Sequence, residues 1–373
     1  MSVCVPAEAE EYHSKDFEWE ALKQKIEDDP SLQHHLLPFH SLQQHEEEEE
    51  EEPEKDSDAW KKFHSRHSSG KFFKERRYLL KEFPELVSCG ESSKLLEVGC
   101  GNGSTALPIL RGNENINVYA CDCSSEILER AKEFVGAVDV ASLKERFHPF
   151  HCDFCTTGFP EWLACDSCRE SCPQKQHDCF SVSDVKEIDR LNLMSLSRES
   201  SCCIGRVDFI TLIFTLSAVP LQKMPTAIKE CYSVLKPGGL LFFRDYGLYD
   251  MTMLRFNPEQ RVGFREYMRS DGTRSYFFSI DTVRNLFLGA GFNEVELEYC
   301  CVKSVNRRKG KSMERTAVIF IHSMGHITAA TSHKINAFAS RFESKICFAE
   351  PEAFIGRAFW HAVGSEVAGF SLA

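Results

Sequence analysis

Four residues in one short stretch could shape a ligand site. In LLEVGCGNGS (95–104), Glu97, Gly99, Gly101 and Gly103 follow a short apolar run. Glycines permit a tight turn and let a ligand come close to backbone N–H groups. The third glycine comes earlier than in the dinucleotide pattern G-x-G-x-x-G, and an acid precedes the turn. A carboxylate at this place would repel a pyrophosphate but stabilise an ammonium group.

Acidic residues also end the next two predicted strands. Asp122 lies 25 residues after Glu97, where a carboxylate can accept hydrogen bonds from both hydroxyls of a ribose. Asp153 can accept from the amine of an adenine, and the neighbouring Phe154 can pack near its ring. Amino acid, ribose and adenine are the parts of S-adenosylmethionine (SAM). The three acids therefore predict a SAM site in preference to one for NAD or ATP.

The elements that would position these residues alternate between short apolar runs and helical segments. We expect strands at 94–100, 116–122, 146–154, 206–216 and 240–247, and a closing hairpin from 295–305 and 314–322. The helical segments between them include SSEILERAKEFV (124–135) and TAIKECYSVLKPGG (226–239). This alternation predicts an α/β, Rossmann-like fold, with a seven-stranded, mostly parallel sheet that ends in an antiparallel hairpin.

Composition divides the chain of 373 residues, whose hydrophobic content of 42% is ample for a core. Residues 1–56 contain a run of glutamates at 46–52 and predict a disordered acidic tail. We expect a basic and aromatic segment at 57–92, followed by a domain at 93–323 that carries the predicted SAM site. Residues 155–205 are rich in Cys and Ser and predict an insertion; 324–373 is a tail of unknown role. The net charge of −12 argues against a general attraction to nucleic acid, although the acidic tail supplies much of it.

The 17 cysteines are not those of a secreted disulfide protein, because the first residues lack a basic start and an apolar run. The sequence contains no apolar run of about 18 residues, the length of a membrane-spanning helix, so no membrane span is predicted. We therefore expect reduced thiols and a cytoplasmic location, with the nucleus as the alternative. Cys165, Cys168, Cys172 and Cys179 have only one pair at zinc-knuckle spacing. A reduced loop is favoured over a zinc site there, so no metal is predicted.

Longer motifs carry a family resemblance. They are WKKFHSRHSSGKFFKERRYLLKEFPEL (60–86), LLEVGCGNG, ACDCS, FHCDF, DFITLIFTLSAV (208–219), LKPGGLLFFRDYGLYDMTMLRF (235–256) and RSDGTRSYFFS (269–279). Over residues 58–322, apart from the insertion, the chain resembles the methyltransferase-like family that makes 3-methylcytidine in tRNA. The resemblance implies a class I SAM-dependent methyltransferase with tRNA as its substrate.

The same resemblance implies which residues contact the cofactor. Trp60 would close over it together with His64, which stands where the family usually has tyrosine. The other contacts that it implies are Gly99, Asp122, Asp153, Phe154 and Ile213. Glu97, Gly101 and Gly103 are further candidates for cofactor contacts, from the glycine turn itself.

The chemistry implied for cytosine N3 needs positioning more than a strong base. N3 carries a lone pair in the ring plane, and the sulfonium of SAM is already an activated leaving group. Arg244, Asp245 and Tyr246 lie at the end of the fifth predicted strand and are candidates for the pocket of the target base. Asp245 would accept from the exocyclic amine and Tyr246 would stack. The alternative is a structural ion pair or a solvated turn.

The basic segment before the glycine turn could meet RNA phosphates. The candidate RNA-binding residues are Lys71, Phe72, Lys74, Arg76, Arg77, Arg255 and Arg274. A solvated helix face is the alternative for the first five and a plain surface position for the last two.

Three functions stay open at this point. The leading hypothesis is a tRNA methyltransferase that forms 3-methylcytidine in the anticodon loop. The others are a protein or small-molecule methyltransferase on the same fold, and a SAM-binding adaptor without activity. The sequence leaves open whether an aminoacyl-tRNA synthetase or another helper protein takes part.

Overall fold

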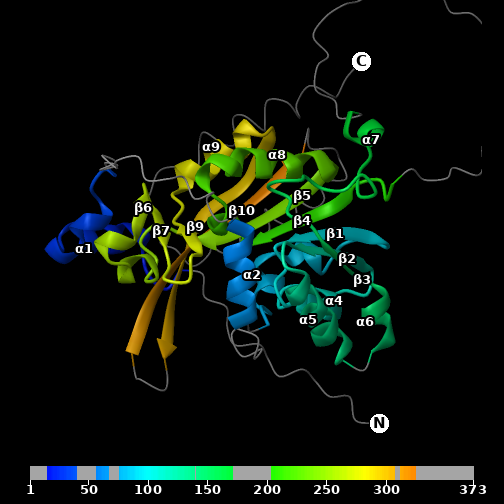
Figure 1. Cartoon of the computed structure of the whole chain (residues 1–373), viewed down its shortest axis with the longest axis horizontal. Helices are drawn as coiled ribbons and strands as arrows, with labels where there is room; N and C mark the ends of the chain where they lie inside the picture. Colours follow the sequence, from blue (N-terminus) through cyan, green and yellow to red (C-terminus); the bar gives the residue numbers. More distant parts are fainter. Residues whose placement is uncertain are drawn as a thin grey trace, which may run out of the picture. The chain divides into compact units, whose positions relative to one another are not determined.

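The computed structural model describes residues 15–39, 56–66, 75–138, 140–170, 203–306 and 311–324. Among these residues, seven strands form one sheet in the order β3-β2-β1-β4-β5-β10-β9. The strands are β1 (Ser93–Val98), β2 (Ile116–Asp122), β3 (Phe147–His151), β4 (Val207–Ile213), β5 (Leu235–Tyr246), β9 (Phe292–Asn306) and β10 (Lys311–Met324). The sheet crosses the centre of Figure 1.

The first five strands run parallel, and β10 is antiparallel to both β5 and β9. Parallel strands that are buried on both faces are nearly continuous apolar runs, as in LLEV and VDFITLI. Parallel pairing also brings the carboxyl ends of β1 to β4 to one edge of the sheet. The turn residues predicted from sequence therefore meet at that edge, and the expected Rossmann-like fold is confirmed.

Helices cover both faces of this sheet (Figure 1). They are α2 (Asp56–Arg66), α3 (Leu79–Glu82), α4 (Ala106–Gly112), α5 (Ser125–Gly136), α6 (Ala141–Glu145), α7 (Asp166–Glu170), α8 (Met224–Val234) and α9 (Ile280–Gly289). Under α8 and α9 lies the main apolar core, which includes Leu96, Leu212, Ile228 and Phe287. On the other face, α5 begins where the Ser124 hydroxyl accepts from Ile127 N, a cap that fixes its start at the end of β2.

A second, three-stranded sheet was not predicted. It consists of β6 (Arg261–Gly263), β7 (Glu266–Met268) and β8 (Arg274–Tyr276), in that order. Its strands have three residues each, too short to show an alternating pattern in the sequence.

The N-terminal segment corrects the prediction of a tail disordered through residue 56. Helix α1 (Trp19–Glu27) and a 3₁₀ helix (Pro30–His35) pack beside the small sheet (Figure 1). The Trp19 ring stacks at 4.4 Å on Tyr299, and its Nε1–H donates to Leu248 O at 3.3 Å. The polyglutamate run dominated the composition and hid this short amphipathic helix. The run itself lies outside the described residues.

The predicted insertion follows β3 and is described only at its ends. Residues 155–170 include α7, and the next described residue is Cys203. Ile204 N donates to Trp162 O at 2.8 Å and Arg206 N to Leu163 O at 3.1 Å, so the two ends are joined. Residues 171–202 and the tail after 324 lie outside the described residues. In the part of the chain that is described, no helix is long and apolar enough to cross a membrane.

We expect Ile26→Ala to lower the free energy of unfolding by about 2–4 kcal/mol, because Ile26 is buried against the small sheet and its removal leaves a cavity. Glu20→Ala, an exposed position on the same helix, is the control. Urea denaturation measures both. Equal stability of the two variants would mean that α1 does not belong to the folded unit.

Candidate functional site

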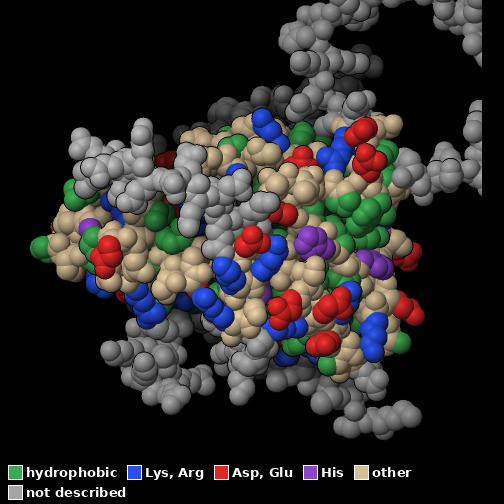
Figure 2. All heavy atoms as spheres, in the orientation of Figure 1, with side chains coloured by type: hydrophobic (Ala, Val, Ile, Leu, Met, Phe, Trp, Pro, Cys, Tyr) green, Lys and Arg blue, Asp and Glu red, His purple; other side chains and the backbone are tan. Residues whose placement is uncertain are grey.

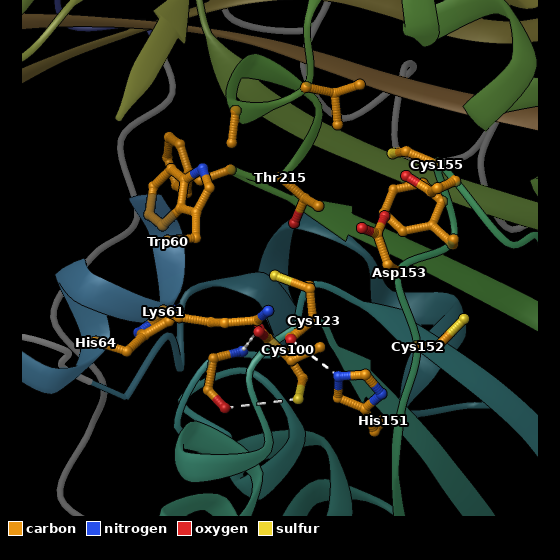
Figure 3. A pocket seen from close by; sticks show the side chains of 18 of the residues that line it. Trp60, Lys61, His64, Cys100, Cys123, His151, Cys152, Asp153, Cys155 and Thr215 are labelled. Carbon is orange, nitrogen blue, oxygen red and sulfur yellow. Dashed lines mark hydrogen bonds between the residues drawn. The ribbon is translucent and has the colours of Figure 1, made fainter. Parts of the chain in front are cut away.

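A cavity of about 530 Å³ opens where the carboxyl ends of β1 to β4 meet. Figure 3 shows its walls, with α2 on one side and the turns after the strands on the other. The lining residues are Trp60, Lys61, His64, Arg76, Gly99, Cys100, Gly101, Ser104, Asp122, Cys123, His151, Cys152, Asp153, Phe154, Cys155, Thr156, Thr157, Ile213, Phe214, Thr215, Ala218, Val219, Pro220 and Lys223.

The glycine turn lies on the cavity wall, and its backbone leaves no room for a side chain at Gly99. Gly99 has φ +68°, and a Cβ there would lie 2.5 Å from Cγ2 of Thr215. The Thr215 hydroxyl donates to Val98 O at 2.9 Å, so this neighbour cannot retreat easily. A ligand can therefore reach the backbone at Gly99 and Gly101. Gly103 does not line the cavity.

Asp122 is held by the turns on both sides of it. Its Oδ2 accepts from Gly101 N and its Oδ1 from Ser124 N, each at 3.0 Å. These bonds fix the carboxylate at the cavity wall, while each oxygen keeps a further lone pair. The remaining acceptor capacity suits the vicinal hydroxyls of a ribose.

The turn after β3 brings Asp153 and Phe154 to the same cavity. Two backbone N–H groups, of Thr156 and Thr157, close the turn on Asp153 O at 3.0 and 2.9 Å. The ring of Phe154 stacks on Phe159, with centroids 5.6 Å apart and planes 9° from parallel. A carboxylate beside a flat apolar wall fits an aromatic ring that carries an amine.

Helix α2 supplies the opposite wall. Trp60 and His64 lie one helical turn apart and both face the cavity, with ring centroids 6.0 Å apart. Arg130 on α5 donates to His64 O at 3.3 Å and ties the helix to the core. These two rings, the glycine turn, Asp122, Asp153, Phe154 and Ile213 thus share one cavity, which fits the parts of SAM.

Glu97 does not line this cavity, contrary to its predicted contact with the cofactor. The carboxyl is 2% exposed, and its Oε2 has no hydrogen-bond partner. Burial raises the pKa of Glu97 to about 8, with the Arg76 charge acting in the opposite direction. Glu97 can therefore influence a bound ligand only indirectly, by positioning the glycine turn or Arg76.

Arg76 corrects a second prediction, that of a phosphate contact. Its guanidinium donates to the hydroxyls of Ser104 and Thr105 at 2.9 and 3.0 Å, and it lies 5.6 Å from the centroid of Phe214. It therefore belongs to the cavity wall. Arg77 points outward, with 73% of its side chain exposed, and pairs with Glu75.

The residues expected at the target base lie on opposite faces of β5. Arg244 pairs with Glu82, and its guanidinium lies 4.9 Å from the Tyr78 ring. This is the structural ion pair that the sequence analysis left open as the alternative to a role in the base pocket. Asp245 is fully buried and accepts from Ser217 N at 2.9 Å and Tyr246 N at 2.8 Å, which anchors the turn after β4. Neither residue lines the cavity.

Tyr246 also lies outside the cavity lining, although its ring is 5.1 Å from that of Phe214. A stacking role for it stays a prediction. Arg274 pairs with Glu266 across the small sheet at 3.2 Å, and Arg255 is exposed at the end of a short 3₁₀ helix. Lys71, Phe72 and Lys74 lie outside the described residues.

Phe214 was missed by the sequence reasoning. It follows β4 with φ +56°, an uncommon conformation for a bulky residue, and it lines the cavity beside Ala218 and Val219. The strain leaves no mark in the sequence, because phenylalanine after an apolar strand reads as core.

Two of the cysteines that line the cavity, Cys100 and Cys123, are poor nucleophiles. Burial raises the pKa of the Cys100 and Cys123 thiols well above the ordinary range. Among the described residues, no three His, Cys, Asp or Glu side chains are grouped to hold a metal ion. Cys172 and Cys179 of the zinc alternative lie outside these residues.

Asp122→Ala should weaken SAM binding by about 1–3 kcal/mol, because it removes the acceptor held at the ribose position. Calorimetry with the purified protein measures this. Asp166→Ala, on an exposed turn of α7, is the control. Unchanged affinity in Asp122→Ala would refute the ribose contact.

Glu97→Gln should gain stability relative to the unsubstituted protein as pH rises. Below pH 8 the folded state keeps the Glu97 proton, whereas the unfolded carboxyl ionises above about pH 4.3. The raised pKa thus stabilises the fold at low pH, and this contribution disappears as pH rises to about 8. Urea denaturation of the cofactor-free proteins should show a relative gain of about 2–3 kcal/mol between pH 5.5 and 8. A difference independent of pH would contradict it.

Residues 72–297 match the family model described as a methyltransferase domain. Human tRNA N(3)-cytidine methyltransferase METTL6 is 35% identical over 268 residues, which cover 71% of this chain and 78% of that protein. METTL2 of Xenopus tropicalis, named as the same kind of enzyme, is 31% identical over 300 residues, or 70% and 75% of the two chains. The tRNA N(3)-methylcytidine methyltransferase trm140 of Schizosaccharomyces pombe is 32% identical over 264 residues, or 69% and 70%. The chain belongs to the tRNA N(3)-cytidine methyltransferase family of class I SAM-dependent enzymes.

Proposed function

We propose that this chain transfers the methyl group of SAM to N3 of a cytosine in the anticodon loop of tRNA. The observation that carries the proposal is the 35% identity with METTL6 across 78% of that enzyme. The cavity supports it independently, because its acceptors and apolar walls suit a nucleoside cofactor.

Each end of the cofactor has a matching part of the wall. Asp122 would accept from the ribose hydroxyls, Asp153 and Phe154 would hold the adenine, and the backbone at Gly99 would meet the amino-acid end. Trp60 and His64 would cover the cofactor from α2. Bound there, SAM supplies a methyl group that its sulfonium already activates.

The part of the wall after β4 suits a base that needs no deprotonation. Ala218, Val219 and Pro220 are apolar and exclude water, and the Phe214 ring offers a flat surface near Tyr246. Cytosine N3 attacks through its own lone pair, so orientation and a dry wall are sufficient. Base pairing hides N3, and the target must therefore be unpaired or flipped out.

Basic residues lie beside this opening. Lys61, Lys62 and Arg66 are exposed on α2, and Figure 2 shows Lys and Arg side chains gathered over this helix and toward the small sheet. Together with Arg77 and the predicted contacts Lys71 and Lys74, they would meet tRNA phosphates. An aminoacyl-tRNA synthetase or another helper protein would add further contacts to the tRNA.

Nucleoside mass spectrometry tests the proposal. Full-length protein is incubated with SAM and tRNA that lacks 3-methylcytidine, with and without a protein extract that contains synthetases. We expect 3-methylcytidine to form at least in the presence of extract, and Asp122→Ala to abolish or strongly reduce it. The extract comes from cells without family members, so that any product depends on the added protein.

Two results would overturn the proposal. One is the absence of 3-methylcytidine in both arms while the protein binds SAM, which would favour an adaptor. The other is transfer of labelled methyl groups to proteins or small molecules of the extract instead of tRNA.

A further inference from the structure

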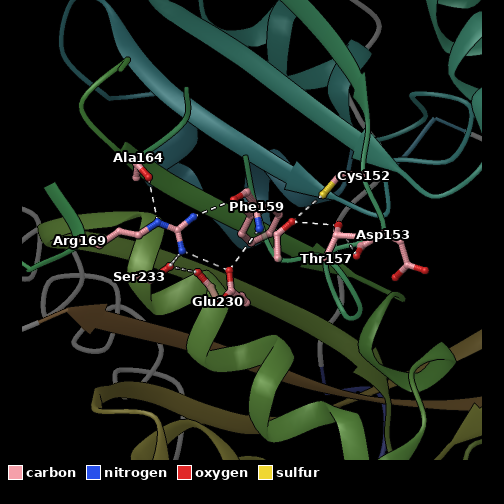
Figure 4. Close-up of polar contacts among 9 residues, drawn as sticks. Cys152, Asp153, Thr157, Phe159, Ala164, Arg169, Glu230 and Ser233 are labelled. Carbon is pink, nitrogen blue, oxygen red and sulfur yellow. Dashed lines mark hydrogen bonds and ion pairs between the residues drawn. The ribbon is translucent and has the colours of Figure 1, made fainter. Parts of the chain in front are cut away.

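The turn that carries Asp153 and Phe154 is held from outside the cavity by an ion pair (Figure 4). We propose that Arg169 and Glu230 are positioning residues for cofactor binding. They fix the loop at 158–164, which in turn fixes the adenine-side wall. Neither residue lines the cavity. The inference concerns cofactor affinity and holds whichever substrate receives the methyl group.

Arg169, on α7, uses its whole guanidinium on this loop and on α8. Nη2 donates to Phe159 O and Nε to Ala164 O, both at 2.8 Å. Nη1 donates to Ser233 Oγ at 3.0 Å and lies 3.4 Å from Oε2 of Glu230. One side chain thus binds both ends of the loop and joins them to a core helix.

Glu230 holds the same loop from α8. Its Oε2 accepts from Phe159 N at 3.2 Å, so the backbone of Phe159 is bound on both its N–H and its C=O. Gly158 has φ +69°, and a Cβ there would lie 2.9 Å from this same oxygen. The carboxylate therefore occupies space that only glycine leaves open.

Phe159 transmits this constraint to the cavity. Its ring lies behind Phe154, which forms the wall, and the two rings are nearly parallel. The neighbouring Gly158 O accepts from Cys152 Sγ at 3.3 Å and from Thr157 Oγ1 at 3.3 Å, and Thr157 Oγ1 also contacts Asp153 O. A shift of residues 158–159 would thus move both Phe154 and the Asp153 turn.

The hydrogen bonds to backbone carbonyls matter more than the charge attraction itself. A partly exposed ion pair contributes little by itself. Residues 152–165 contain no helix or strand, so the carbonyls of Phe159 and Ala164 depend on Arg169 for a donor. Loss of this donor frees the loop, and a small misplacement of a binding wall weakens binding strongly.

The test compares Arg169→Met with a matched arginine. Arg146 likewise donates to backbone carbonyls, those of Asn113, Ile116, Leu110 and Ser142 at 2.8, 3.0, 3.0 and 3.2 Å, but at the amino end of β3, away from the cavity. Calorimetry with S-adenosylhomocysteine, thermal unfolding, and KM for SAM against kcat are measured for both variants.

We expect Arg169→Met to raise the Kd and the KM for SAM about tenfold and to leave kcat at saturating SAM within about twofold. Arg146→Met should lower the unfolding temperature without changing the Kd. Arg169→Lys should recover only part of the affinity, because an ammonium can still donate to a carbonyl but reaches fewer of them than a guanidinium does. Gly158→Ala, which displaces Glu230 without removing a charge, should raise the Kd in the same direction.

Two outcomes would overturn the proposal. Arg169→Met could lose stability as Arg146→Met does while its Kd stays within twofold, which would make the pair structural only. A fall in kcat at saturating SAM without a change in Kd would place the effect on the chemistry. Binding of S-adenosylhomocysteine and thermal unfolding need no tRNA, so these two measurements decide the proposal even if the proposed substrate is wrong.

Discussion

The two hydrogen bonds accepted by the Asp122 carboxylate organise the site. They join the glycine turn after β1, the end of β2 and the start of α5 at a single side chain. The arrangement requires parallel neighbours, because only then do both strands end at the same edge. It also requires a left-handed backbone at Gly101, since its N–H must point to the neighbouring strand. The sheet topology, the position of the glycine and the placement of the cofactor-binding carboxylate therefore depend on one another.

The sequence predicted those cavity residues whose positions follow from the local pattern of strands and turns. Asp122 and Asp153 follow apolar runs that read as strands, and strand ends predict where they meet. Arg76 and Arg244 were misassigned for the opposite reason. Their partners are 28 and 162 residues away, at Ser104 and Glu82, and nothing in the local pattern announces them. A cation in a basic segment reads as exposed until its distant partner is known.

The pair of Arg244 with Glu82 also explains how the basic segment joins the core. Both side chains are almost fully buried, with 9% and 2% exposed. Two buried charges are costly unless they meet, so either partner alone would be strongly unfavourable. The pairing fixes α3 against β5, and Phe83 beside it packs on Phe242 at 4.9 Å. The ion pair specifies where the segment packs on the core, whereas the apolar contact supplies the stabilising free energy.

The joined ends of the segment between β3 and β4 have an evolutionary consequence. Trp162 and Leu163 bind Ile204 and Arg206 through their backbones, so the chain leaves and returns at neighbouring, anchored points. Lengthening a loop between fixed ends costs only about 0.6 kcal/mol for each doubling. Insertions and deletions between these anchored points are therefore expected to cost little folding free energy, a tolerance that evolution can use. The same property makes this segment a suitable place to graft a reporter domain.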